Sequence, residues 1–226
     1  LAGVRAARPG VQLGLARSTL QYDRRLSLQL TFLTQLVEKD RLALLMNLLL
    51  LGRHYHSQHR HDFAAMLFYR AIEGCLREGL RSSAPDLTTR APDYALLCGA
   101  GSPFPTEAEL LAAYQNLCKK LYGDRPEQLP HRLGCIDTAA LLYLLKDPML
   151  RRAELHTLKA LGHLRQLGEI RNMSILAHGY ESVSEAEALQ LAARAKLLLS
   201  AVWTGMKRTD DMDQTLTELA FLQVGD

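Results

Sequence analysis

Residues 169–179 read EIRNMSILAHG and set Arg171 and His178 seven positions apart. On a helix, seven positions make almost two turns, so both side chains are expected on one face, about 10 Å apart along the axis. A guanidinium can grip two phosphate oxygens at once, and an imidazole can transfer a proton near neutral pH. Asn172 can orient the imidazole or a phosphate oxygen. These three residues therefore form a candidate site for cutting a phosphodiester without a metal.

The same stretch predicts a helix over about residues 163–177. Ile170, Met173 and Leu176 have the spacing of a buried helical face. Gly162 is expected to mark a kink or a break before this helix. Gly179 is suited to the left-handed residue that often follows a helix end.

Capping residues followed by apolar residues at helical spacing recur along most of the chain. Aromatic residues make up only 6% of the sequence, while leucine is abundant, which favours helices over sheets. We therefore expect an all-α fold with no sheet of more than two short strands. The expected helices cover about residues 18–39, 40–51, 62–81, 106–122, 138–146, 148–161 and 184–206.

Two segments depart from the helical pattern. Residues 1–17 are rich in glycine and arginine and are expected to be a linker or an N-terminal arm, followed by one helical domain over residues 18–226. Residues 82–105 are rich in proline and glycine and predict a long irregular insertion. A long loop in a compact domain is often functional, so this insertion is a candidate to shape a substrate groove or a partner interface.

The order R-N-x5-H-G at Arg171 and His178 resembles the R-x(4–6)-H motif of HEPN ribonuclease domains. It is most similar to the HEPN part of CRISPR-associated ribonucleases that also carry a CARF sensor domain. A second stretch, residues 62–73 (DFAAMLFYRAIE), resembles the helix that precedes the active-site region in that family. The resemblance covers about residues 40–206 and implies a HEPN-like helical bundle.

The resemblance also implies an activity, a metal-independent endoribonuclease that acts in antiviral defence. In such an enzyme the ribose 2′-hydroxyl of single-stranded RNA attacks the adjacent phosphate and leaves a 2′,3′-cyclic phosphate. His178 would transfer protons, Arg171 would hold the phosphate, and Asn172 would orient the imidazole or a phosphate oxygen. One helix cannot surround a phosphate, so a two-fold homodimer is expected to bring two such motifs into one cleft. No metal or cofactor is expected at the site.

Two alternatives of another class stay open. The first is an inactive HEPN dimer that serves as a binding module or as a toxin–antitoxin component. The second is a helical adaptor in which the motif is a coincidence, and a strictly monomeric protein would favour it. The chain begins with Leu rather than Met, so a ligand-sensing domain upstream of these residues also stays open.

The remaining features are interpreted as structural. The net charge of +3 is too small to indicate nucleic-acid binding by itself, and the apolar run at residues 44–51 is too short to span a bilayer. No cysteine pair has zinc spacing, and reduced thiols in a cytoplasmic protein are expected. Arg70 and Glu73 are expected to form an ion pair one helical turn apart, with contact to an RNA backbone as the alternative. The histidine cluster lacks the i, i+4 spacing of helical zinc pairs, so a helix junction is expected at His54, His56, His59 and His61.

Overall fold

The structure is a computed structural model that describes residues 9–176 and 179–220. The chain divides into two compact units. One is formed by residues 1–44 and 211–226, and the other by residues 45–210. The smaller unit contains α1 (Pro9–Val37) and α9 (Met212–Leu219). The guanidinium of Arg25 on α1 donates hydrogen bonds of 3.0 Å to the backbone carbonyls of Glu218 and Ala220. These bonds fasten α9 to α1.

The first helix begins earlier than expected. Its predicted start at residue 18 is wrong, because α1 already runs from Pro9. Residues 1–8 lie outside the described residues. The assignment of residues 1–17 to an arm and of residues 18–226 to one helical domain stays a prediction.

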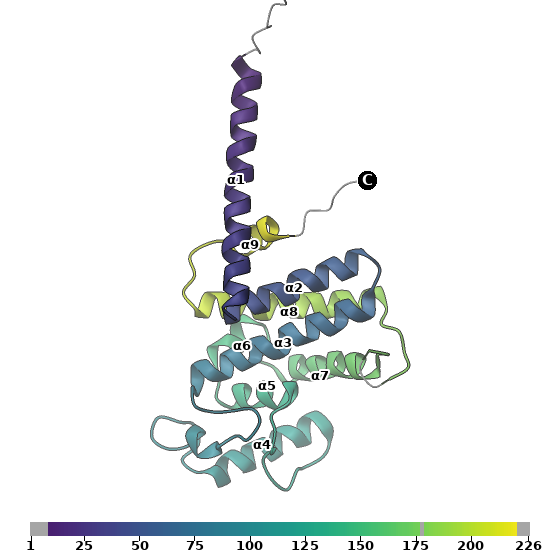
Figure 1. The fold of residues 1–226 in the computed structure, drawn as a ribbon. Coiled ribbons are helices and arrows are strands. Elements are labelled where there is room, and N and C mark those ends of the chain that lie inside the picture. Colours follow the sequence, from purple (N-terminus) through teal and green to yellow (C-terminus); the bar gives the residue numbers. More distant parts are fainter. Residues whose placement is uncertain (1–8, 177–178, 221–226) are drawn as a thin grey trace, which may run out of the picture. The chain divides into compact units, whose positions relative to one another are not determined.

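The larger unit is a bundle of helices (Figure 1). Among residues 9–176 and 179–220 there is no strand, and the one pairing of β type is an isolated bridge between Ser174 and Glu181. The predicted all-α, HEPN-like fold is therefore confirmed. In chain order the elements are α2 (Arg41–Ser57), α3 (His61–Ser83), the 3₁₀ turn η1 (Tyr94–Leu97), α4 (Glu107–Tyr122), α5 (Cys135–Leu144), α6 (Pro148–Arg152), α7 (Leu158–Met173) and α8 (Glu185–Gly205).

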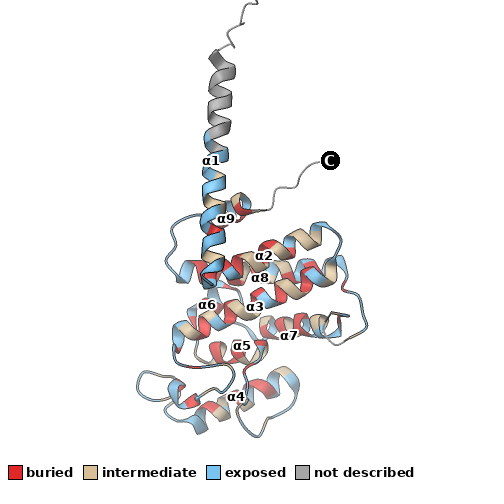
Figure 2. Cartoon of the chain, viewed as in Figure 1, coloured by how far each residue is buried: buried red, intermediate tan, exposed pale blue. Residues whose placement is uncertain are grey.

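Helix α3 is the centre of this bundle, since it packs against α8, α5 and α7. Its large apolar side chains recur three or four positions apart and are almost completely buried, among them Phe68, Ile72, Leu76 and Leu80. The buried faces of α3, α5 and α8 are red in Figure 2. Each such side chain contributes about 1.5–3 kcal/mol through burial. The stretch that resembles the family helix is therefore also the main element of the core.

Local capping signals were reliable guides to several helix starts. The side chains of Asp40, Thr106 and Ser184 accept hydrogen bonds from the backbone N–H groups of residues three positions on, as expected at an N-cap. Glu187 completes a capping box by accepting a hydrogen bond of 2.8 Å from the backbone N–H of Ser184. These contacts fix the starts of α2, α4 and α8.

Three predicted boundaries are wrong. Helix α5 starts at Cys135 rather than 138, so Asp137 lies in its first turn, where it accepts a hydrogen bond of 2.7 Å from the hydroxyl of Tyr114. The helix expected over residues 148–161 ends at Arg152. A new helix, α7, begins at Leu158 and passes through Gly162 without a break.

Residues 82–105 form the expected irregular insertion, interrupted only by η1. Within the part of the chain that the structure describes, none of the helices combines the length and the apolar character that crossing a bilayer requires.

Candidate active site

Helix α7 carries Arg171 and Asn172 in its last turn. Thr157 caps its start by accepting a hydrogen bond of 3.2 Å from the backbone N–H of Ala160. At Ser174, which is 2% exposed, the backbone becomes extended. The prediction of a helix through residue 177 is therefore wrong, and so is the placement of Arg171 and His178 on one continuous helical face.

The chain turns back at this point instead of continuing the helix. The N–H of Ile175 donates to the carbonyl of Glu181 (3.2 Å), and the N–H of Glu181 donates to the carbonyl of Met173 (3.1 Å). The N–H of Gly179 donates to the carbonyl of Ser174 at 3.1 Å. We call residues 174–181 the motif loop.

His178 itself lies outside the described residues. Its neighbours on both sides in sequence, residues 174–176 and 179–181, are held at the C-terminal end of α7 by the three hydrogen bonds of the motif loop. The two ends of the segment that contains His178 are thus anchored next to the turn that carries Arg171.

Gly179 has a different role from the helix cap expected for it, because α7 ends six residues earlier. A Cβ atom at position 179 would overlap the backbone carbonyl group of Met173. A side chain there would have to push the two ends of the motif loop apart.

Gly179→Ala is expected to lower RNA cleavage strongly, because the added Cβ atom would collide with the carbonyl of Met173. The unfolding midpoint of the bundle should remain nearly unchanged, since this collision is confined to the motif loop. Gly162→Ala on α7 is a matched control, because no atom lies within 4 Å of a Cβ built there. That change should stabilise the protein by about 1 kcal/mol, the usual difference between alanine and glycine in a helix. Cleavage assays and thermal unfolding of both variants would test this, and full activity of Gly179→Ala would contradict it.

The side chain of Arg171 packs on an aromatic ring of α3. Its guanidinium carbon lies 5.4 Å from the ring centroid of Tyr69, within the range of a cation–π contact. One N–H of Nη1 donates to the side-chain oxygen of Asn172 at 3.0 Å. Asn172 thus orients the arginine in this structure.

Arg171 retains free hydrogen-bonding capacity. Among the described residues no carboxylate forms an ion pair with it, and its buried Nε has no hydrogen-bond partner. A buried donor without a partner costs about 1–3 kcal/mol, which an incoming acceptor can recover. The guanidinium is therefore held by Tyr69 and Asn172, but no carboxylate neutralises its charge. A group that binds phosphate needs such an unneutralised charge.

Tyr69 was not recognised as part of the site from the sequence. Its ring is 7% exposed, and this burial, together with the neighbouring Cys135, raises the pKa of the phenol well above its usual value. Burial also raises the pKa of the Cys135 thiol to about 12. Both groups stay neutral in the physiological range, so Tyr69 offers Arg171 an uncharged aromatic surface.

The pair next to Tyr69 is formed as predicted. Arg70 and Glu73 make an ion pair of 2.8 Å on α3. Asp62, at the start of α3, accepts a hydrogen bond of 3.0 Å from the backbone N–H of Val183. This second contact was not anticipated, and it ties the chain just after the motif loop to the same helix that carries Tyr69.

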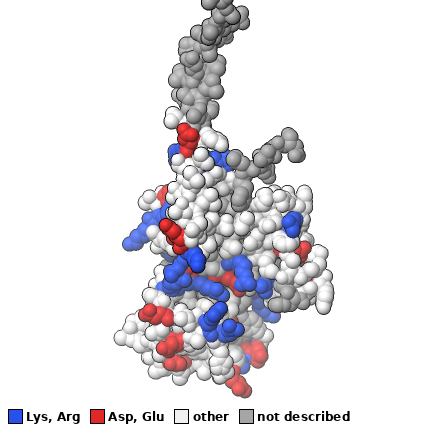
Figure 3. Space-filling view, viewed as in Figure 1, with Lys and Arg blue, Asp and Glu red and all other residues white. Residues whose placement is uncertain are grey.

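An acidic hollow of about 290 Å³ lies at the end of α7, lined also by the chain that follows the motif loop. Its carboxylates come from Glu169, Glu181 and Glu187. Hydrogen bonds from the side chain and backbone of Ser184 lower the pKa of Glu187, which keeps it ionised. The carboxylates disfavour a phosphate in this hollow, and Glu169 is already paired with Arg165 at 2.9 Å. Lysines and arginines gather across the middle of the face drawn in Figure 3, with acidic side chains among them.

The histidine cluster forms the junction between α2 and α3. The rings of His56 and His61 lie 5.1 Å apart, and those of His59 and His61 lie 6.0 Å apart. Within residues 9–176 and 179–220, no three potential ligands come together as a metal site requires.

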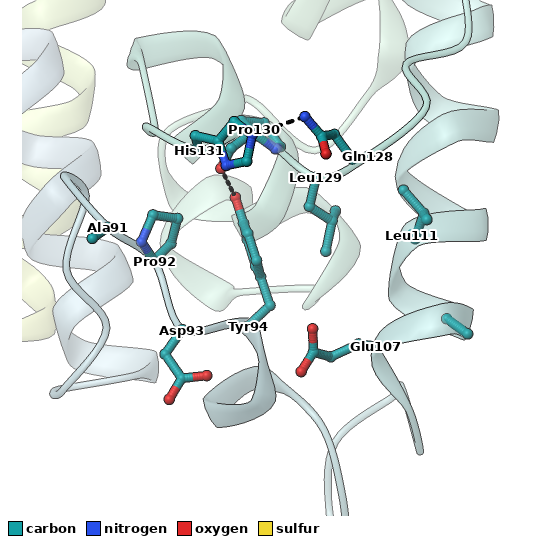
Figure 4. A pocket seen from close by; sticks show the side chains of 11 residues that line it. Ala91, Pro92, Asp93, Tyr94, Glu107, Leu111, Gln128, Leu129, Pro130 and His131 are labelled. Atoms are coloured by element: carbon teal, nitrogen blue, oxygen red, sulfur yellow. Dashed lines mark hydrogen bonds between the residues drawn. The ribbon is translucent and has the colours of Figure 1, made fainter.

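The irregular insertion contributes to a pocket of about 580 Å³ (Figure 4). Tyr94 of η1 lines this pocket, and its hydroxyl donates a hydrogen bond of 2.6 Å to the carbonyl of Pro130. His131 is paired with the amide of Gln128 at 2.8 Å, a contact that occupies this histidine. A role of the insertion in a groove or a partner interface stays a prediction.

The chain is similar to known proteins. It is 33% identical over 144 residues to the CRISPR system endoribonuclease Csm6 of Thermus thermophilus. This similarity covers 60% of the present chain but only 26% of that relative. A family model described as the Csm6 HEPN domain matches residues 34–200, well over half of the 226 residues. The chain therefore belongs to the family of CRISPR-associated HEPN domains that this model describes.

Proposed function

We propose that this chain is a metal-independent endoribonuclease that cuts single-stranded RNA and acts as an effector in CRISPR antiviral defence. The observation that carries the proposal is the state of Arg171, which is stacked on Tyr69 and has no carboxylate partner among the described residues. The anchored loop that contains His178 begins in the same helical turn. Arg171 is the proposed phosphate clamp, and the described ends of the segment that contains the proposed proton-transfer group, His178, are hydrogen-bonded next to the last turn of α7.

In the proposed reaction, the 2′-hydroxyl of a ribose loses its proton and its oxygen attacks the adjacent phosphorus. The bond from phosphorus to the 5′-oxygen of the next nucleotide breaks, and that oxygen takes up a proton. The products are a 2′,3′-cyclic phosphate and a free 5′-hydroxyl. His178 transfers the protons, Arg171 stabilises the charge that grows on the phosphate, and Asn172 holds the arginine in place.

The site is proposed to be completed by a second copy of the chain. Around Arg171 and the motif loop, three apolar side chains are largely exposed, namely Met173 (49%), Ile175 (57%) and Tyr180 (96%). Exposed apolar side chains that cluster are typical of surfaces that bind a partner. A two-fold axis near this surface would bring two copies of Arg171 and His178 into one cleft.

Tyr180→Ala is expected to weaken the homodimer by about tenfold or more, because tyrosines at the centre of interfaces often contribute over 1 kcal/mol. RNA cleavage should fall with the dimer fraction and recover at high protein concentration. Leu96→Ala serves as the control, since Leu96 is also exposed (48%) but belongs to η1. Sedimentation equilibrium of both variants measures the effect. A dimer unaffected by Tyr180→Ala would place the interface elsewhere.

The direct test of the proposal is cleavage of an unstructured RNA in EDTA, with mapping of the product ends. Cutting that persists in EDTA and leaves 2′,3′-cyclic phosphates is expected. A requirement for a divalent metal, or cutting of DNA, would refute the mechanism. If the protein binds RNA but does not cut it, the alternative of an inactive HEPN dimer that acts as a binding module or toxin–antitoxin component is favoured.

A further inference from the structure

A second hollow, of about 480 Å³, lies between the end of α5 and helix α6. Buried Leu142 and Leu150 are part of its apolar lining. Its polar and charged lining is formed mainly by Tyr143, Lys146, Arg151 and His156. A hollow with an apolar lining and basic groups fits an anion that also carries an apolar or aromatic body.

The two cations of the hollow, Lys146 and Arg151, are not paired with the carboxylate in its lining. Lys146 and Arg151 are exposed and form no ion pair with another described residue. The carboxylate in the lining, Asp147, is buried and already accepts hydrogen bonds from the backbone N–H of Met149 (2.7 Å) and from the hydroxyl of Ser83. The two cations therefore remain available for an external anion.

The hollow and the candidate active site lie at opposite ends of α7. His156, in the lining, precedes the first residue of α7, Leu158, by two positions, and Arg171 lies in the last turn. Thirteen residues of α-helix separate Leu158 from Arg171, which is about 20 Å. An extended single strand covers this distance with a few nucleotides, so one strand can reach both places.

We propose that this hollow is a second RNA subsite, which binds one nucleotide of the single-stranded substrate away from the bond that is cut. Lys146 and Arg151 bind its phosphate, and its base lies against Tyr143 and the apolar lining. Stacking of a base on an aromatic side chain is worth about 1–3 kcal/mol and depends little on sequence. The identity of the ligand as substrate RNA rests on the proposed function.

Lys146 permits an unusually clean test. Its φ angle is 55°, in the left-handed region that glycine adopts without strain. Lys146→Gly therefore removes the ammonium group without disturbing the helix end. Lys207 also has a left-handed φ, 56°, directly after α8, and is absent from the lining of the hollow. Lys207→Gly is thus a control matched in residue, charge and backbone conformation.

The experiment measures binding of a fluorescent RNA of about 12 nucleotides, a length within the range of single-strand sites. All variants are made in a His178→Ala protein so that binding does not depend on cleavage. Lys146→Gly and Arg151→Gln are each expected to weaken binding by about threefold to tenfold. The double variant should also reduce the slope of log affinity against log salt by about 0.7, the value for one lost phosphate contact on a single strand, and each single variant should reduce it by less. Lys207→Gly should leave both quantities unchanged.

Unchanged affinity in both Lys146→Gly and Arg151→Gln would overturn the subsite. So would an equal loss in Lys207→Gly, which would indicate a general charge effect, or no RNA binding by the His178→Ala protein. Failure of the proposed function is a separate result, since it is read from the cleavage assay of the natural sequence. RNA binding that depends on Lys146 in a protein without cleavage activity would refute the nuclease and retain the subsite.

Discussion

His178→Ala is expected to abolish RNA cleavage while the fold and the homodimer remain intact. The change removes the group that we propose to transfer protons to and from the reacting oxygens, and such groups typically contribute about 10²–10⁴-fold to the rate. Single-turnover cleavage of an unstructured RNA is the appropriate measurement, because product release then does not mask the chemical step. Circular dichroism and sedimentation should not distinguish the variant from the natural sequence.

A substrate variant separates loss of catalysis from loss of binding. An RNA with a single 2′-deoxyribose at the cleaved position lacks the attacking hydroxyl and should bind but resist cutting at that bond. If the His178→Ala protein still cleaves RNA, the assignment of His178 is wrong. The histidine junction between α2 and α3 is then the next place to examine, since His56 and His61 each have a buried ring nitrogen without a hydrogen-bond partner.

Most of the fold could be predicted because its signals are local. Thr106 and Ser184 cap α4 and α8 as their positions in the sequence indicated, and the apolar spacing of residues 62–81 belongs to the central helix α3. A cap and a periodic face depend only on residues a few positions apart. They are therefore visible without knowledge of the tertiary structure.

The end of the motif helix could not be predicted in this way. The apolar spacing of residues 170–177 favours a helix, but backbone hydrogen bonds between residues 173–175 and Glu181 replace the helical ones. These bonds depend on Gly179, because the absence of a side chain lets its backbone lie against the backbone of Met173. Backbone pairing across the motif loop thus replaces the helical hydrogen bonds in the segment that follows Arg171.

Tyr69, whose ring contacts the guanidinium of Arg171, was not predicted as part of the site, because the contact is between residues far apart in sequence. Tyr69 lies in the YRAIE stretch that resembles the family helix, yet 102 positions separate it from Arg171. Only the packing of α3 against α7 brings the two side chains together. The motif in the sequence made Arg171 a candidate, whereas its contact with the ring of Tyr69 could be recognised only in the structure.

Arg171→Lys is expected to reduce cleavage by about 10²-fold, the effect of removing one preorganised donor from a charge-stabilising site. An ammonium keeps the positive charge but has neither the planar fork nor the flat surface that stacks on Tyr69. The effect should appear mainly in kcat, because the lost interaction is strongest when charge grows on the phosphate. Steady-state kinetics on the same RNA measure this division.

Arg165→Lys on the same helix is the matched control for this change. Its guanidinium carbon also lies over a tyrosine, 5.0 Å from the ring of Tyr122, but it forms an exposed ion pair of 2.9 Å with Glu169. Exposed ion pairs contribute only about 0–1 kcal/mol, so this variant should cleave RNA almost normally. Equal losses in Arg165→Lys and Arg171→Lys would mean that both changes act through the stability of the fold, because lysine keeps the positive charge at each position. A loss confined to Arg171→Lys would instead locate the phosphate clamp at the end of α7. The two positions share helix, residue type and aromatic contact, whereas Arg165 is already occupied by Glu169 and by the carbonyl of Leu121, to which it donates a hydrogen bond of 3.2 Å.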